Sequence, residues 1–116
     1  MNNRFAAVAK KLKNGTVKRY VDGKLHRDDG PAVERDNGTR KWYRHGRLHR
    51  EDGPAIEWAN GVREWWLNGK LHRDDGPAIE DGEGFEMYYL EGEWFFEKKD
   101  WVEAKLSKSP RADEAR

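Results

Sequence analysis

The chain has 116 residues, of which 39% are charged, a formal net charge of +1 and no cysteine. This length allows one domain, and the absence of cysteine excludes a disulfide scaffold and a thiolate metal site. The aromatic residues, each able to bury about 150–250 Å², predict a thin, aromatic-rich core. No run approaches the ~20 apolar residues of a membrane span. The apolar run at 5–9 is too short for a signal sequence, so we expect a cytoplasmic protein.

Residues 1–13 are predicted to form a short N-terminal helix. Phe5, Val8 and Leu12 recur at the spacing of one helical face in a stretch rich in Ala and Lys. We expect this helix to cap the first edge of the β-sheet predicted next, because an open edge strand invites unwanted pairing.

Residues 14–96 contain a sequence repeat. The phrase "LHRDDGPA" occurs at 25–32, returns as "LHREDGPA" at 48–55 and returns again at 71–78, so that the period is 23 residues. A fixed period of this size is typical of repeat proteins. The repeated phrase therefore indicates a repeat fold in the first place, and a catalytic site only in the second.

Each repeat carries the signals of a β-hairpin. It opens with a strand-like run such as "TRKWYR" or "VREWWL", and a two-residue turn signal follows. Such turns are favoured between β-forming residues because their backbone twist matches that of the strands. We predict a mainly β fold, a single-layer twisted antiparallel sheet of about four tandem hairpins. The predicted turns are Asp22-Gly23, His45-Gly46, Asn68-Gly69 and Glu91-Gly92.

Two aromatic columns lie on opposite faces of the predicted sheet, because side chains alternate along a strand. The first is aromatic in every repeat and is predicted to be the core ladder: Tyr20, Tyr43, Trp66 and Tyr89. The second begins with Arg19 and is predicted to be exposed and to bind a partner. Its binding residues are Trp42, Trp65 and Tyr88, with Arg19, Arg40 and Arg44 beside them.

A C-terminal cap is predicted over 97–108, followed by a loose tail at 109–116. Asp100 and Glu103 have the spacing of a capping box at a helix start. Repeat sheets need such end caps.

The segment "WLNGKLH" at 66–72 resembles the MORN repeat, which also has a period of 23. The resemblance covers 14–96 and is strongest to bacterial and phage MORN-variant proteins with "LHRxDGPA" phrases, some of which are described as antitoxins. It implies β-hairpins in one curved sheet, and an antitoxin-type or membrane-surface module. Arg27, Arg50 and Arg73 stand where the eukaryotic motif has glycine.

The repeated histidines suggest either a metal-binding or catalytic site or a structural contact at the turns. Each precedes an aspartate by three residues, which would suit metal binding or acid–base chemistry. However, copies about 10 Å apart cannot converge on one metal with ligands at ~2 Å. We therefore expect no metal, no cofactor and no catalytic residue, and a structural role at the turns for His26, Asp29, His49, Asp52, His72 and Asp75.

Charge divides the chain into two halves. Residues 1–50 have a formal charge of +9 and residues 51–116 one of −8. Together with the aromatic ladder, this predicts a non-catalytic protein-binding module, an inhibitor or adaptor of phage or bacterial type acting on a host or defence protein. The oppositely charged ends would also allow oligomers. The alternative is nucleic-acid binding by the basic half, through Arg19, Lys24, Arg40, Arg44 and Arg47, interleaved with Trp42 and Tyr43.

Overall fold

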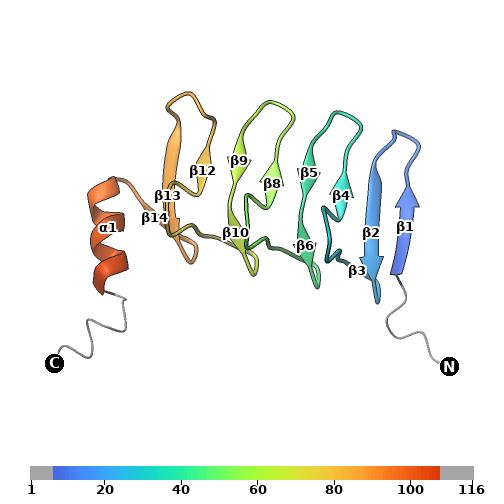
Figure 1. The fold of residues 1–116 in the computed structure, drawn as a ribbon, viewed down its shortest axis with the longest axis horizontal. Helices are drawn as coiled ribbons and strands as arrows, with labels where there is room; N and C mark the ends of the chain where they lie inside the picture. Colours follow the sequence, from blue (N-terminus) through green and yellow to red (C-terminus); the bar gives the residue numbers. More distant parts are fainter. Residues whose placement is uncertain (1–6, 108–116) are drawn as a thin grey trace.

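The computed structural model describes residues 7–107, and these form a row of β-hairpins that ends in a helix (Figure 1). The predicted mainly β, antiparallel hairpin fold is confirmed. The strands are β1 (Ala7–Lys11), β2 (Val17–Val21), β3 (Lys24–Leu25), β4 (Val33–Glu34), β5 (Arg40–Lys41), β6 (Tyr43–Arg44), β7 (Arg47–Leu48), β8 (Ile56–Glu57), β9 (Arg63–Glu64), β10 (Trp66–Leu67), β11 (Lys70–Leu71), β12 (Ile79–Glu80), β13 (Glu86–Leu90) and β14 (Glu93–Phe95), and the helix is α1 (Lys98–Ser107).

The main sheet is an antiparallel meander in the order β1-β2-β4-β5-β8-β9-β12-β13-β14. Each repeat adds two strands to it. The register is the same in successive repeats: Ile56 pairs with Lys41 on one side and with Glu64 on the other. The repeats therefore line up at equivalent positions along the sheet.

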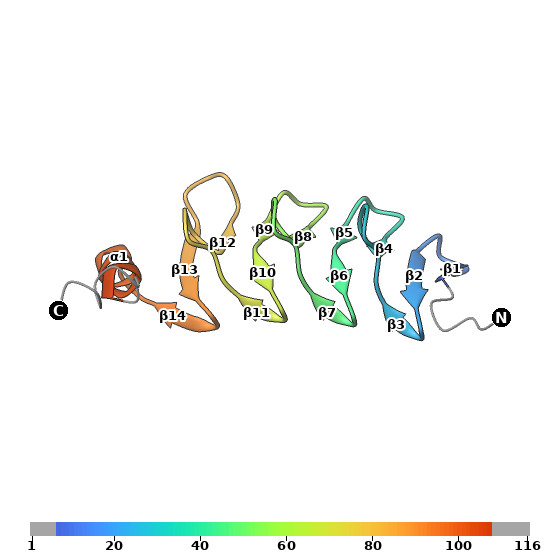
Figure 2. The same ribbon diagram turned by 60° about the horizontal axis from the view of Figure 1, so that its bottom comes forward.

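The lower ends of the repeats form a second row of short hairpins, which Figure 2 shows turned away from the upper strands. Their backbones bond from one repeat to the next. Gly46 donates its N–H to the carbonyl of Leu25 at 2.8 Å, and Arg27 donates to the carbonyl of Tyr43 at 3.3 Å. Neighbouring repeats are thus joined at both ends of each hairpin.

The predicted tight turns are confirmed by their backbone angles. Asn68 and Gly69 have φ values of 49° and 81°, and Glu91 and Gly92 have 49° and 87°. Positive φ at both central residues is the mark of the type I′ turn. His45, at φ 50°, adopts the same conformation although histidine favours it less than asparagine does.

The predicted N-terminal helix is wrong for the part that the structure describes. Residues 7–11 form strand β1, which pairs with β2 from Ala7↔Val21 to Lys11↔Val17. The rest of the predicted helix, including Phe5, lies in 1–6, outside the described residues. The edge of β2 offers a full row of backbone partners, whereas a short isolated helix is marginal in water. Strand pairing therefore prevails over a weak helical pattern.

The predicted C-terminal helix is confirmed as α1, within two residues of the expected bounds. Trp101 is only 4% exposed, and its ring packs 4.8 Å from that of Tyr88 on β13. The described part of the chain contains no helix that is both long and apolar enough to cross a membrane. The predicted tail, 109–116, lies outside the described residues.

In most of the hairpin repeats the buried side chains are small or β-branched, so the predicted aromatic ladder is not the core there. Near the C-terminal end the described core is a cluster of Tyr88, Leu90 and Trp101. Tyr20, Tyr43, Trp66 and Tyr89 are each only half-buried. A single sheet has no second layer to cover such large rings, whereas small side chains can be buried between neighbouring backbones. The buried residues of the repeats include Thr16, Ala32, Val33, Thr39, Ala55, Ile56, Ala78, Tyr88 and Leu90, together with His26 and His49.

Candidate binding face

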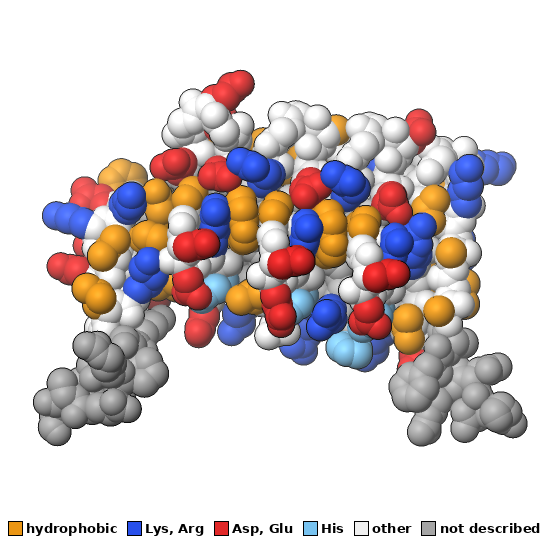
Figure 3. Space-filling view, viewed as in Figure 1, with side chains coloured by type: hydrophobic (Ala, Val, Ile, Leu, Met, Phe, Trp, Pro, Cys, Tyr) orange, Lys and Arg blue, Asp and Glu red, His pale blue; other side chains and the backbone are white. Residues whose placement is uncertain are grey.

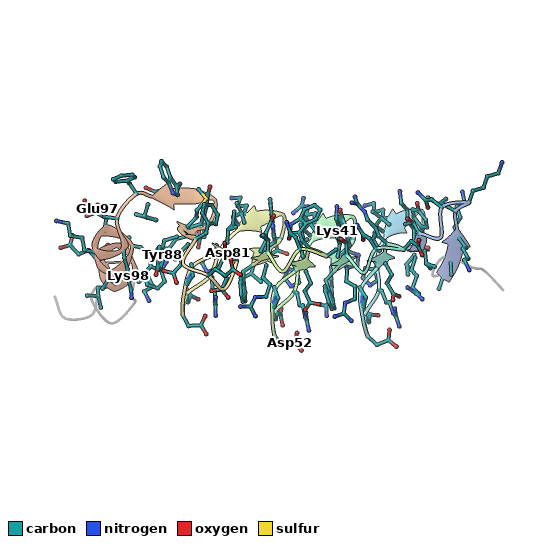
Figure 4. All side chains as sticks on the ribbon, turned by 90° about the horizontal axis from the view of Figure 1, so that it is seen from above. Lys41, Asp52, Asp81, Tyr88, Glu97 and Lys98 are labelled. Carbon is teal, nitrogen blue, oxygen red and sulfur yellow. The ribbon has the colours of Figure 1, made fainter. Side chains whose placement is uncertain are left out.

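The sheet has one face on which aromatic and arginine side chains alternate; we call it the Arg–Trp face. It carries Trp42, Trp65 and Tyr88. Figure 3 shows the alternation as a band of hydrophobic and basic side chains across the molecule, above three clusters of acidic ones. Figure 4 shows Asp52 projecting from this face and Lys41 from the other.

Arg50 is held in place on this face by four contacts. Its guanidinium carbon lies 3.8 Å from the ring centroid of Trp42. Its Nε donates to Asp52 at 3.0 Å, and its Nη1 donates to the carbonyl of Pro54 at 3.0 Å and to Glu57 at 3.1 Å. A guanidinium that is stacked on a ring and held by three hydrogen bonds is a fixed part of the surface.

The same arrangement recurs in the next repeat. Arg73 lies 3.7 Å from the ring centroid of Trp65 and donates to Asp75 at 2.9 Å and to the carbonyl of Pro77 at 3.0 Å. In the first repeat, Arg27 makes the equivalent bonds to Asp29 and to the carbonyl of Pro31.

This geometry explains most of the repeated phrase. A Cβ on Gly53 would lie 3.0 Å from the guanidinium carbon of Arg50, so a side chain there would require the arginine to shift. The aspartate and the proline carbonyl anchor that arginine, and the alanine, such as Ala55 at 0% exposure, is enclosed by the sheet. The phrase encodes one rigid corner in each repeat.

The histidine of the phrase ties each repeat to the next. The Nδ1 atom of His26 accepts the backbone N–H of His45 at 2.9 Å. His49 accepts from Asn68 at 2.9 Å in the same way, and His72 accepts from Glu91 at 2.8 Å. The donor is always the first residue of the type I′ turn in the following hairpin.

The predicted pairing of each histidine with the aspartate three residues later is wrong. His26 Nε2 lies 2.9 Å from Asp28, and His72 Nε2 lies 3.2 Å from Asp74, whereas the aspartate at the predicted position bonds to arginine. Because Nδ1 accepts a hydrogen bond, Nε2 carries the proton and donates it to the carboxylate. The Nδ1 atoms of the histidines link successive repeats instead of closing a turn within one.

His49→Ala is expected to lower the free energy of unfolding by about 1–3 kcal/mol, because the N–H of Asn68 loses its buried acceptor. Thermal and urea melts would measure this loss. The control is Glu51→Ala, which removes the carboxylate 3.3 Å from Nε2 but leaves the Nδ1 acceptor. That side chain is 73% exposed, so its removal should cost less than about 1 kcal/mol. Equal losses in the two variants would contradict the role assigned to Nδ1.

Two open grooves lie between successive corners of the Arg–Trp face. One, of about 550 Å³, is lined by Trp42 between the corners at 27–31 and 49–52. The other, of about 540 Å³, is lined by Trp65 between the corners at 50–53 and 72–75. The two grooves are one repeat apart and share a tryptophan, an arginine and an acidic corner, but Arg44 lines the first groove where Leu67 lines the second.

The rims of these grooves are acidic. Asp28, Glu51 and Asp74 each lie 2.9–3.3 Å from a histidine Nε2, and their side chains are 73–79% exposed. Asp29 and its equivalents Asp52 and Asp75 are 85–87% exposed and bond to arginine. The hydrogen bond and the charge of Arg27 hold the pKa of Asp29 below its usual value, so this carboxylate stays ionised at neutral pH.

The predicted binding residues differ in their exposure and in their partners. Trp42 and Trp65 line grooves, but Tyr88 is only 9% exposed because Trp101 packs against it. Burial raises the pKa of the Tyr88 hydroxyl. Each predicted arginine faces a carboxylate: Arg19 with Glu34, Arg40 with Glu57 at 2.8 Å, and Arg44 with Asp28 at 3.9 Å.

Arg50 and Arg73 also belong to this face, although neither is among the predicted binding residues. Their signal was present, since arginine occupies the same place in every copy of the phrase, eight residues after the aromatic position. Trp101 was predicted only as part of a cap. It occupies the place over Tyr88 that the arginines occupy over the tryptophans.

Within residues 7–107, no cluster of three or more His, Asp or Glu side chains could hold a metal ion. Comparison of the chain with protein families, with characterised proteins and with solved structures finds no match.

Proposed function

We propose that this chain is a MORN-like protein-binding module that acts by binding and not by catalysis, and that its partner lies in the grooves of the Arg–Trp face. The observation that supports this most is the repetition. Two adjacent grooves have the same tryptophan, the same stacked arginine and the same acidic rims. A partner that crosses both grooves gains two equivalent contacts from one rigid surface.

The residue types support a protein partner. Tryptophan and arginine are enriched at the sites that contribute most to binding energy between proteins. Arg50 and Arg73 are already fixed by stacking and hydrogen bonds, so their ordering costs little upon binding. The exposed rims supply negative charge that can steer and orient a basic partner.

Nucleic acid is the weaker candidate for the same surface. Phosphate binding needs free cations, and Arg19 and Arg40 are paired with carboxylates. The rims would also repel a phosphate backbone. Arg44 faces the rim residue Asp28, although its distance of 3.9 Å makes this pair loose.

The family resemblance refines this proposal. By analogy with the bacterial and phage MORN-variant proteins, we propose a cytoplasmic inhibitor or adaptor that acts on a host or defence protein. Its fold would supply a fixed surface and its partner would supply the activity being controlled.

Trp65→Ala is expected to weaken partner binding by about 30-fold, which corresponds to the ~2 kcal/mol of a strong interface residue. The measurement is a pull-down from bacterial lysate with mass spectrometry, followed by titration of the captured protein. The matched control is Trp94→Ala, which removes a tryptophan that is 51% exposed and lies on β14, outside the grooves. Thermal melts of both variants would show whether folding is retained.

Retention of the same partner by folded Trp65→Ala would contradict the proposed site. Capture of nucleic acid instead, with log K falling by about 0.9 per log unit of salt for each neutralised phosphate, would favour the alternative.

A further inference from the structure

The spacing and charge of the two grooves define the kind of segment that would fit them; this argument rests on the proposed function. Each repeat adds two strands to the sheet. At ~4.8 Å between strands, successive grooves are about 10 Å apart along the sheet. A bound chain that follows the sheet must present equivalent side chains at this interval.

A polyproline-II helix has this interval. It rises about 3.1 Å per residue with three residues per turn, so residues i, i+3 and i+6 recur on one side every ~9.3 Å. An extended β-strand covers a similar distance in three residues, but its side chains alternate and the third points to the opposite side. The groove spacing therefore favours polyproline II over a β-strand.

The charges of the rims select cationic side chains. Asp29 and its equivalents are neutralised by arginine, but Glu51 and Asp74 face histidines whose Nδ1 already accepts a hydrogen bond. Asp28 faces such a histidine too, with Arg44 as a loose second neighbour at 3.9 Å. These three carboxylates recur once per repeat and are largely exposed. A lysine or arginine would place its charge near a rim and its aliphatic stem against Trp42 or Trp65.

We propose that the Arg–Trp face binds a polyproline-II segment of a partner protein that carries lysine or arginine at every third residue. The tryptophans contact the cationic side-chain stems and the prolines, and the rims at Asp28, Glu51 and Asp74 bind the charges. Three rims accommodate three cations over seven consecutive residues, i, i+3 and i+6.

The test uses a fluorescently labelled peptide of three Pro-Pro-Lys triplets, titrated with the full chain and measured by anisotropy. A peptide of the same composition with its lysines adjacent is the matched control. We expect the periodic peptide to bind at least ten-fold more tightly. Equal affinity for the two peptides would mean general charge attraction and would overturn the proposal, as would the absence of binding.

Variants of the protein test the rims and the grooves separately. The double variant Glu51→Gln/Asp74→Asn should bind the periodic peptide about ten-fold or more weakly, while its melting temperature stays that of the unmodified protein. Glu103→Gln, at an exposed carboxylate on α1, should leave affinity unchanged. Unchanged affinity in the rim variant would overturn the proposal.

This outcome is separable from that of the proposed function. If the peptide does not bind but Trp65→Ala still abolishes capture of a protein, only the polyproline-II inference fails. If Trp65→Ala captures the protein normally, the binding face itself is wrong.

Discussion

Trp101→Ala is expected to lower the free energy of unfolding by about 3–5 kcal/mol, as truncation of a buried tryptophan does. Trp101 is 4% exposed and packs against Tyr88 with the two rings tilted by 53°, and its Nε1 donates to the carbonyl of Arg73 at 3.2 Å. Removal of this side chain would leave Tyr88 uncovered and α1 without its anchor. Urea denaturation followed by tryptophan fluorescence and circular dichroism would measure the loss.

The damage should be local because the repeats contact only their neighbours. Hydrogen exchange should show loss of protection in α1 and β13, with β2 and β4 less affected. The control is Leu106→Ala on the same helix, where the side chain is 66% exposed and little loss is expected. Uniform loss of protection along the whole sheet would contradict the linear arrangement of stability.

Ile56→Ala is expected to lower the free energy of unfolding by about 2–5 kcal/mol, because apolar burial is lost and a cavity remains. Ile56 is 4% exposed and lies on β8, between β5 and β9 in the middle of the sheet. A loss there should uncouple the two ends of the sheet, so that urea unfolding broadens or divides into two transitions. Thermal and urea melts with probes at each end would detect this.

The matched control is Val8→Ala, which also shortens a β-branched residue in a strand. Val8 is 53% exposed on β1, and its truncation should change the free energy of unfolding by less than about 0.5 kcal/mol. If the two variants were equally stable, Ile56 would not belong to the core assigned here.

The repeated hairpins could be predicted from local sequence because their signals are local. A turn such as Asn68-Gly69 needs only its own backbone preference, and the period of 23 places the same turn in each repeat. Even Glu91, a poor residue for positive φ, follows the pattern because Gly92 and the flanking strands determine the turn. The helix around Trp101 was likewise predicted, but α1 begins at Lys98, so Asp100 lies in its first turn and the predicted capping box does not mark its start.

The burial of the aromatic residues could not be predicted from the sequence. Alternation shows which residues share a face, but not which face is covered. Tyr88 and Trp65 occupy the same column, yet one is buried under Trp101 and the other lines a groove. That difference arises because α1 folds back over only the last hairpin.

By itself, the sequence determined the repeat, the hairpins, their turns and the division of charge, since each depends on residues close together in the chain. Only the tertiary structure decided the partners of the repeated histidines and arginines. The Nδ1 atom of His49 accepts the backbone N–H of Asn68, which is 19 residues further along the chain in the next hairpin. Arg50 reaches back to Trp42 across its own hairpin. Such contacts depend on how the hairpins bend and pack against one another. The spacing of residues along the sequence does not predict that geometry.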